Sequence, residues 1–172
     1  EAHPTDLSPS HLEIMRDAGV TRLSVGVQSF DDKLLKQMGR SNGINPAKHL
    51  RRAQQHFMVN VDLIYNFAGQ TIEQFVHDLD ILIEIGISQI TCYPLMPAPG
   101  KFKHVDVANE RQYYRAMLDR LKVAGYVPLT PWAFTRSPEE SQGEYISNTG
   151  GEQYLGVGVS SISKLAPLFT IN

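Results

Sequence analysis

Segments with strand periodicity alternate along this chain with segments of helix periodicity, and no other feature constrains its fold as strongly. Three segments favour strands, each followed by a loop and an amphipathic helix: residues 22–28, 59–65 and 87–93. Such units need crossover connections and therefore build parallel sheets. The sequence predicts an α/β fold with roughly three to five parallel strands, too few for the usual eight-stranded barrel. We expect a partial (β/α) TIM-like barrel or an open sheet.

Helix signals separate the predicted strands. Ser8 precedes Pro9, an arrangement typical of an N-cap and first helical position, and Thr71 with Gln74 fits a capping box. Gly86 is placed to end the helix that Thr71 begins. Further helices are predicted from Asp31 to Gly39, from Asn45 to about His56 and from about Ala108 to Ala124, with another strand near 127–134.

Each predicted strand carries polar side chains on one of its two faces. Barrel interiors usually hold Val, Ile and Leu, so a polar face is costly unless it is hydrogen-bonded or filled by a ligand. Asp62 and Gln28 together suit a ligand that bears ammonium or hydroxyl groups. Active sites in such folds lie at the carboxyl ends of strands. The residues on the polar faces are Ser24, Gln28, Asn60, Asp62, Thr91 and Tyr93.

Several residues have an interpretation that needs no ligand. Taken singly, Ser24, Asn60 and Thr91 are more often hydrogen-bonded to a neighbour or solvated. Residues 156–161 contain two glycines but do not match the dinucleotide pattern, so a turn or buried strand is favoured there. The six histidines have no metal-ligand spacing, which favours solvated positions.

Charge and cysteine content exclude several classes. The chain has 16 Lys+Arg against 18 Asp+Glu, so it lacks the basic footprint of a nucleic-acid-binding protein. No apolar run approaches the roughly 20 residues of a membrane span, and we expect a cytoplasmic protein. Cys92 is the only cysteine, which excludes an internal disulfide and a multi-thiolate metal site. Its apolar strand predicts a small core residue.

Six short motifs resemble, in order and spacing, the oxygen-independent coproporphyrinogen III oxidase family of radical S-adenosylmethionine enzymes. This resemblance implies a partial (β/α)6 barrel that binds a [4Fe-4S] cluster and S-adenosylmethionine. Reductive cleavage of that cofactor gives the family its 5′-deoxyadenosyl radical, which abstracts hydrogen from the substrate. The motifs are Glu1-Ala2-His3-Pro4, Arg22-Leu23-Ser24-Val25-Gly26-Val27-Gln28-Ser29-Phe30, Gly39-Arg40, Val61-Asp62-Leu63-Ile64-Tyr65, Gly69-Gln70-Thr71 and Leu155-Gly156-Val157-Gly158-Val159-Ser160-Ser161-Ile162-Ser163.

The resemblance also implies six cofactor-binding positions. The polar contacts with S-adenosylmethionine would be Glu1, Gln28, Arg40 and Asp62, and the apolar or backbone contacts Met96 and Ile162. Strand alternation independently selects Asp62 and Gln28. Glu1 and Arg40 rest on the resemblance alone, since an arginine after a short helix is most often a surface charge. No catalytic residue is assigned.

Two parts of the family pattern are expected outside this chain. The CxxxCxxC loop that ligates the cluster would precede Glu1, and the substrate domain would follow Asn172. Residues 1–172 are therefore expected to be the C-terminal half of a radical S-adenosylmethionine core within a longer protein, inactive alone. An open edge of that half-barrel predicts self-association.

The resemblance implies a function on tetrapyrroles. The leading hypothesis is oxidative decarboxylation of a porphyrinogen in haem biosynthesis, which needs an electron donor for the cluster. The alternatives are a haem-binding chaperone of the same fold and a radical methyltransferase or haem-degrading relative. Residues 65–69 read Tyr-Asn-Phe-Ala-Gly where the family commonly has Tyr-Gly-Leu-Pro-Gly, which leaves the substrate open. Loops 94–100 and 128–134 suit either an aromatic wall for a flat macrocycle or packing on the barrel rim.

Overall fold

The computed structural model describes residues 1–40, 43–96, 107–137, 153–158, 161–165 and 168–171. A central sheet contains five strands, in the spatial order β1-β2-β3-β5-β4. β1, β2 and β3 pair in parallel, as the alternation of strands and helices predicts. The strands are β1 (Arg22–Gln28), β2 (Met58–Tyr65), β3 (Gln89–Pro94), β4 (Val127–Pro128) and β5 (Ala133–Thr135).

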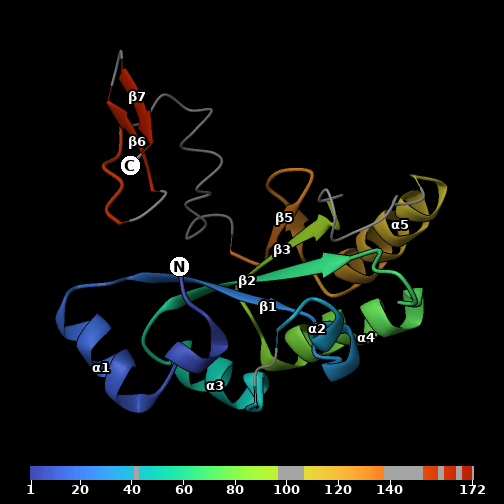
Figure 1. The fold of residues 1–172 in the computed structure, drawn as a ribbon, viewed down its shortest axis with the longest axis horizontal. Helices are drawn as coiled ribbons and strands as arrows, with labels where there is room; N and C mark the ends of the chain where they lie inside the picture. Colours follow the sequence, from blue (N-terminus) through green and yellow to red (C-terminus); the bar gives the residue numbers. More distant parts are fainter. Residues whose placement is uncertain (41–42, 97–106, 138–152, 159–160, 166–167, 172) are drawn as a thin grey trace.

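The helices begin where the sequence predicts. Ser8, Asp31, Asn45 and Thr71 each accept a backbone N–H at a helix N-terminus, and Thr71 forms the expected capping box with Gln74. Only the helix after Asn45 is clearly shorter than predicted, since it ends at Ala53. The helical elements are η1 (Pro4–Asp6), α1 (Pro9–Asp17), α2 (Asp32–Gln37), α3 (Pro46–Ala53), α4 (Ile72–Ile85) and α5 (Val107–Val123). Figure 1 shows α1, α3 and α4 on one side of the sheet.

The prediction of an all-parallel sheet is wrong beyond β3. β5 pairs antiparallel with both β3 and β4, so it lies between two strands that run in the opposite direction. The segment near 127–134 is a tight hairpin, because Leu129 and Thr130 donate their backbone N–H groups to the Ala133 carbonyl. A chain that reverses over so few residues cannot make the long crossover that parallel pairing needs.

A separate two-stranded antiparallel sheet consists of β6 (Ile162–Leu165) and β7 (Leu168–Ile171). Figure 1 shows this hairpin well away from the central sheet. Gly156 packs its backbone against β6, donates its N–H to Ser163 Oγ at 3.0 Å and leaves no room for a Cβ beside the Ile162 carbonyl. This close approach at Gly156, together with the φ of +113° at Gly158, favours the structural interpretation of the two glycines over a nucleotide loop.

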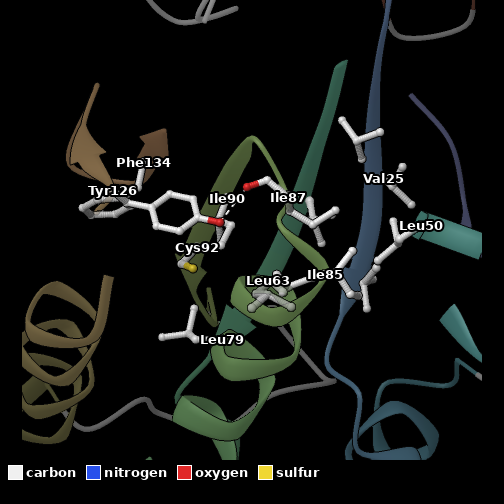
Figure 2. Close-up of a cluster of buried hydrophobic side chains, with 14 of the residues drawn as sticks. Val25, Leu50, Leu63, Leu79, Ile85, Ile87, Ile90, Cys92, Tyr126 and Phe134 are labelled. Atoms are coloured by element: carbon white, nitrogen blue, oxygen red, sulfur yellow. Dashed lines mark hydrogen bonds between the residues drawn. The ribbon is translucent and has the colours of Figure 1, made fainter. Parts of the chain in front are cut away.

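The hydrophobic core fills the space between the sheet and its helices. Alternate residues of β1, namely Leu23, Val25 and Val27, are buried there together with apolar residues of β2, β3 and α4. Figure 2 shows this packing around Ile90 and Cys92. Cys92 is fully buried and burial raises the pKa of its thiol, which confirms the prediction of a core residue. None of the helices in the described ranges has both the length and the apolar character of a membrane span.

Candidate functional site

A cavity of about 470 Å³ lies against the polar face of the sheet, opposite the hydrophobic core. Its size is within the roughly 300–1,000 Å³ of small-molecule sites. The polar side chains that strand alternation selects, from Ser24 to Tyr93, all line it. The full lining is Glu1, Ala2, His3, Asp6, Arg22, Ser24, Gly26, Gln28, Arg40, Asn60, Asp62, Gln89, Thr91 and Tyr93.

The start of the chain extends the sheet beside β1. Ala2 forms a parallel bridge with Val25, donating its N–H to the Ser24 carbonyl at 2.8 Å and accepting from the Gly26 N–H at 3.0 Å. This pairing brings Glu1 to the cavity, next to the inward-facing residues of β1. Glu1 was expected here only from the resemblance, because a single bridged residue carries no strand periodicity.

A chain of hydrogen bonds fixes the carboxylate of Asp62 in the cavity. Ser24 Oγ donates to Asp62 Oδ2 at 3.2 Å, and Asn60 Nδ2 donates to Asp62 Oδ1 at 2.8 Å. Asn60 Nδ2 also lies 2.8 Å from Ser24 Oγ, and Thr91 Oγ1 donates to Asn60 Oδ1 at 2.8 Å. Ser24, Asn60 and Thr91 are thus hydrogen-bonded to neighbours, as expected of each alone. Together they orient one carboxylate, which is the pattern of a prepared ligand site.

Gly26 gives Gln28 and Arg40 their positions in the cavity. A Cβ at Gly26 would lie 2.8 Å from Gln28 Nε2 and 3.7 Å from Arg40 Nη1. Arg40 Nη1 also donates to the Gly26 carbonyl at 3.3 Å. The absent side chain therefore leaves space for an amide and a guanidinium directly over the strand. Sequence reasoning missed Gly26, although glycine in mid-strand often marks such a close approach.

Backbone geometry at the carboxyl end of β1 aims Gln28 into the cavity. Gln28 has φ of +70°, in the left-handed region that most side chains avoid, and the pairing with β2 shifts register between Gly26 and Gln28. The buried Asp78 on α4 holds the next turn, accepting from Ser29 Oγ at 2.7 Å and from the Phe30 N–H at 3.1 Å. Burial raises the pKa of Asp78 to about 6. An unusual backbone conformation that is fixed by hydrogen bonds to a neighbouring helix is typical of functional sites.

Gln89 and Arg22 line the amino-terminal end of the same cavity. Gln89 is only 2% exposed, yet its Oε1 has no hydrogen-bond partner in the part of the chain that the structure describes, and the same holds for Arg22 Nε. Buried polar atoms without partners are rare in folded proteins and fit a site that a ligand or water fills. Sequence reasoning did not select Gln89, although its alternation with Thr91 places it on the same face of β3.

Met96 and Ile162 do not line this cavity. Met96 follows β3 with 69% of its surface exposed, and Ile162 lies in β6 with 40% exposed. The structure therefore brings Glu1, Gln28, Arg40 and Asp62 together and places the other two expected residues elsewhere. Their roles as cofactor contacts stay predictions.

The loop after β2 retains a backbone conformation that suits glycine. Asn66 has φ of +69°, and Asn109 Nδ2 donates to its side-chain oxygen at 3.1 Å. Asparagine adopts this conformation more readily than other residues with a side chain. The family pattern has glycine at this position, so the substitution preserves the turn while adding an amide.

The residues present do not fit a [4Fe-4S] cluster. Such clusters are held by cysteine thiolates, and the chain has one cysteine, whose fully buried side chain lies in the core on the opposite side of β3 from the cavity lining. The cavity does fit a polar organic cofactor, because it combines prepared carboxylate, amide and guanidinium groups with the space above Gly26.

Comparison with known proteins shows similarity to radical SAM proteins. Residues 1–82 match the Radical SAM superfamily. A protein named heme chaperone HemW from Bacillus subtilis (strain 168) is 28% identical over 185 residues, covering 100% of this chain and 48% of that protein. The radical S-adenosyl methionine domain-containing protein 1, mitochondrial, from Bos taurus is 29% identical and covers 97% of this chain and 40% of that protein. The chain spans about half the length of the curated relatives it matches.

Solved structures support the fold. The coproporphyrinogen III oxidase HemN from Escherichia coli superimposes with a TM-score of 0.75 at 21% identity, covering 94% of this chain and 43% of that one. Streptococcus suis SuiB bound to S-adenosylmethionine gives a TM-score of 0.52 at 20% identity, covering 67% of this chain and 28% of that one. The predicted partial TIM-like barrel is thereby confirmed. The comparisons also confirm the resemblance seen in the sequence: residues 1–82 match the Radical SAM superfamily, and the chain is similar in fold to HemN and in sequence to proteins named heme chaperone HemW.

Proposed function

We propose that the chain forms the S-adenosylmethionine-binding part of a radical SAM protein that handles a tetrapyrrole. The observation that carries this proposal is the hydrogen-bonded Asp62 carboxylate, which shares one cavity with Glu1, Gln28 and Arg40. The match of residues 1–82 to the superfamily supports it.

The chemistry of the cofactor suits these groups. S-adenosylmethionine carries an ammonium, a carboxylate, two ribose hydroxyls and an adenine. Asp62 and Glu1 can accept from the ammonium or the hydroxyls, and Arg40 can donate to the carboxylate. Gln28 can both donate and accept, and Gly26 lets the ligand approach the strand. The protein's share is to bind and orient the cofactor, which supplies the radical chemistry when bound.

We propose that the cysteine ligands of the cluster lie in a part of the protein outside residues 1–172. Residues 1–172 would then be the C-terminal half of the core domain of a longer cytoplasmic protein, and an electron donor would act on the part that holds the cluster. Anaerobic reconstitution of the full-length protein with iron, sulfide and reductant tests this. Formation of 5′-deoxyadenosine above the uncatalysed background is expected, and its absence would overturn the enzymatic part of the proposal.

Haem delivery is the tetrapyrrole function that the relatives favour. The relatives at 28% and 27% identity are named heme chaperones, whereas the likeness to HemN, at 21% identity, supports only the fold. Oxidative decarboxylation of coproporphyrinogen is the second candidate, because the motifs of the sequence resemble those of the coproporphyrinogen III oxidase family. A stoichiometric haem complex without coproporphyrinogen turnover would favour the chaperone, and turnover would favour the oxidase. A radical methyltransferase or a haem-degrading enzyme would instead convert its own substrate to a modified product.

Self-association follows from the same proposal. One edge of this half-barrel is β1, whose outer side is bridged only by Ala2 within the described residues, so a second copy can pair there. Light scattering on the 172-residue chain is expected to give a mass above that of the monomer, whereas a monomer at all concentrations would contradict it.

A further inference from the structure

Helix α5 presents apolar side chains on two faces. Tyr113, Met117 and Leu121 are buried in the hydrophobic core. The neighbouring face repeats at helical spacing and carries Arg111, Tyr114, Arg115 and Leu118. Tyr114 and Leu118 are partly buried against the core, and their remaining surface faces the side of the helix that carries the two arginines.

This second face lines a groove of about 620 Å³, which we call the α5 groove. Its other wall is the β4–β5 hairpin, which contributes Pro131 and Trp132. The Trp132 ring lies edge-on to Tyr114, with 6.4 Å between centroids, and 6.5 Å from the ring of Tyr93. Tyr93 lines the cavity that holds Asp62, so Trp132 stands between the two spaces. The complete lining is Glu110, Arg111, Tyr114, Arg115, Leu118, Asp119, Pro131 and Trp132.

The two arginines in the groove are available to a ligand. Within the described ranges, neither guanidinium makes an ion pair or a hydrogen bond, whereas Arg120 on the same helix is paired with Asp80. Arg111 and Arg115 stand one helical turn apart, so they can reach two carboxylates of one ligand. Glu110 and Asp119 lie at the two ends of this stretch of helix, outside the pair of arginines in sequence.

We propose that the α5 groove binds a tetrapyrrole, with its ring system against Trp132 and Tyr114 and its propionate carboxylates on Arg111 and Arg115. This inference rests on the proposed function and names the surface for its substrate class. Aromatic walls with a few placed cations are the usual composition of a site for a flat anionic ligand. Haem and coproporphyrinogen both combine a tetrapyrrole with propionates, so the groove serves either candidate function. The Tyr93–Trp132 contact places such a ligand beside the Asp62 cavity.

Tryptophan fluorescence tests the proposal directly, because Trp132 is the only tryptophan in the 172-residue chain. Haem and coproporphyrin III are the probes, titrated separately with saturable quenching as the readout. The double variant Arg111→Ala/Arg115→Ala is expected to weaken binding of both probes at least about tenfold, since the loss of a single hydrogen bond between charged groups already has an effect of this size. Arg111→Lys/Arg115→Lys, which keeps the charges, is expected to recover part of this loss.

Lys122→Ala is the matched control, because Lys122 is an exposed cation on α5 outside the groove. It is expected to bind both probes like the original chain. Equal affinities for the double alanine variant and the original chain would overturn the proposal, as would the absence of saturable binding by the original chain. Titration of the same samples with S-adenosylmethionine distinguishes failure of this proposal from failure of the proposed cofactor site. If the chain binds S-adenosylmethionine but no tetrapyrrole, the α5 groove is not a tetrapyrrole site, and the cofactor site still stands.

Discussion

The hydroxyl of Ser29 donates a 2.7 Å hydrogen bond to the buried carboxylate of Asp78, 49 residues away along the chain. Asp78 also accepts the Phe30 N–H, so a helix on the core side of the sheet fixes the turn that follows Gln28. Gln28 in turn faces the cavity on the opposite side. The position of one expected cofactor contact therefore depends on a carboxylate that never touches the cavity.

Asp78 should give the stability of the chain a recognisable pH dependence. Burial raises its pKa from 3.8 to about 6, so the folded state holds this proton more tightly than the unfolded state. Its contribution to the free energy of unfolding is full below about pH 4 and is lost as the pH rises through about 6. The loss is about 3 kcal/mol, from roughly 1.4 kcal/mol for each pKa unit.

Urea unfolding of the original chain and of Asp78→Asn between pH 4 and 7 measures this contribution. The variant mimics the neutral acid and keeps an acceptor for the Phe30 N–H. We expect the original chain to lose stability relative to the variant as the pH rises through this range. Parallel curves would show that the carboxyl group does not titrate with a raised pKa.

Gly26→Ala should weaken cofactor binding without unfolding the chain. The new methyl group would lie 2.8 Å from Gln28 Nε2, which is the far end of a flexible side chain, so Gln28 moves and the strand stays. We expect the Kd for S-adenosylmethionine to rise about tenfold, equivalent to one lost hydrogen bond. Calorimetric titration measures the Kd, and urea unfolding checks that the fold persists. An unchanged Kd would show that the cofactor does not occupy the space above Gly26.

Replacing Asn66 distinguishes backbone strain from side-chain loss. Both Asn66→Gly and Asn66→Ala remove the hydrogen bond from Asn109, but only alanine places a Cβ at φ of +69°. We expect the alanine variant to be less stable than the glycine variant by about 1 kcal/mol. The difference in free energy of unfolding between the two variants is the measurement. Equal stability would mean that the loop relaxes to another conformation.

Cys92 should be unreactive in the folded chain. Its thiol is fully buried and its raised pKa suppresses the thiolate that attacks disulfide reagents. We expect negligible labelling by an aromatic disulfide reagent in buffer and complete labelling of one thiol in denaturant. Rapid labelling under native conditions would contradict the packing around Ile90 and Cys92 in Figure 2.

The parallel half of the sheet and its polar face were predictable from the sequence, because both follow from local periodicity. Alternation in β1 and β2 identifies Gln28 and Asp62, and capping residues identify the helix starts. The insertion of β5 between β3 and β4 was not predictable in this way. A strand of three residues has too few alternations to reveal its direction, which depends on pairing between distant segments.

The supporting residues of the site were harder to find than the residues that face the cavity. Asp78 occupies an ordinary position in an amphipathic helix, and only the folded structure shows that its carboxylate is buried against Ser29. Gly26 is one of 13 glycines, and its importance comes from the side chains of Gln28 and Arg40 that fold over it. Both roles arise from contacts between separate elements, which periodicity does not encode.

Binding of S-adenosylmethionine by Asp62→Asn tests the central claim most directly. Calorimetric titration compares this variant with the original chain and with Glu13→Gln, a control that removes an exposed carboxylate that does not line the cavity. Asparagine keeps the size of the side chain but loses the charge and one of the two oxygens that can accept from the cofactor's ammonium or hydroxyls, so we expect the Kd to rise at least about tenfold. The control should bind like the original chain. Equal affinity in Asp62→Asn and the original chain would contradict the assignment of this cavity to S-adenosylmethionine.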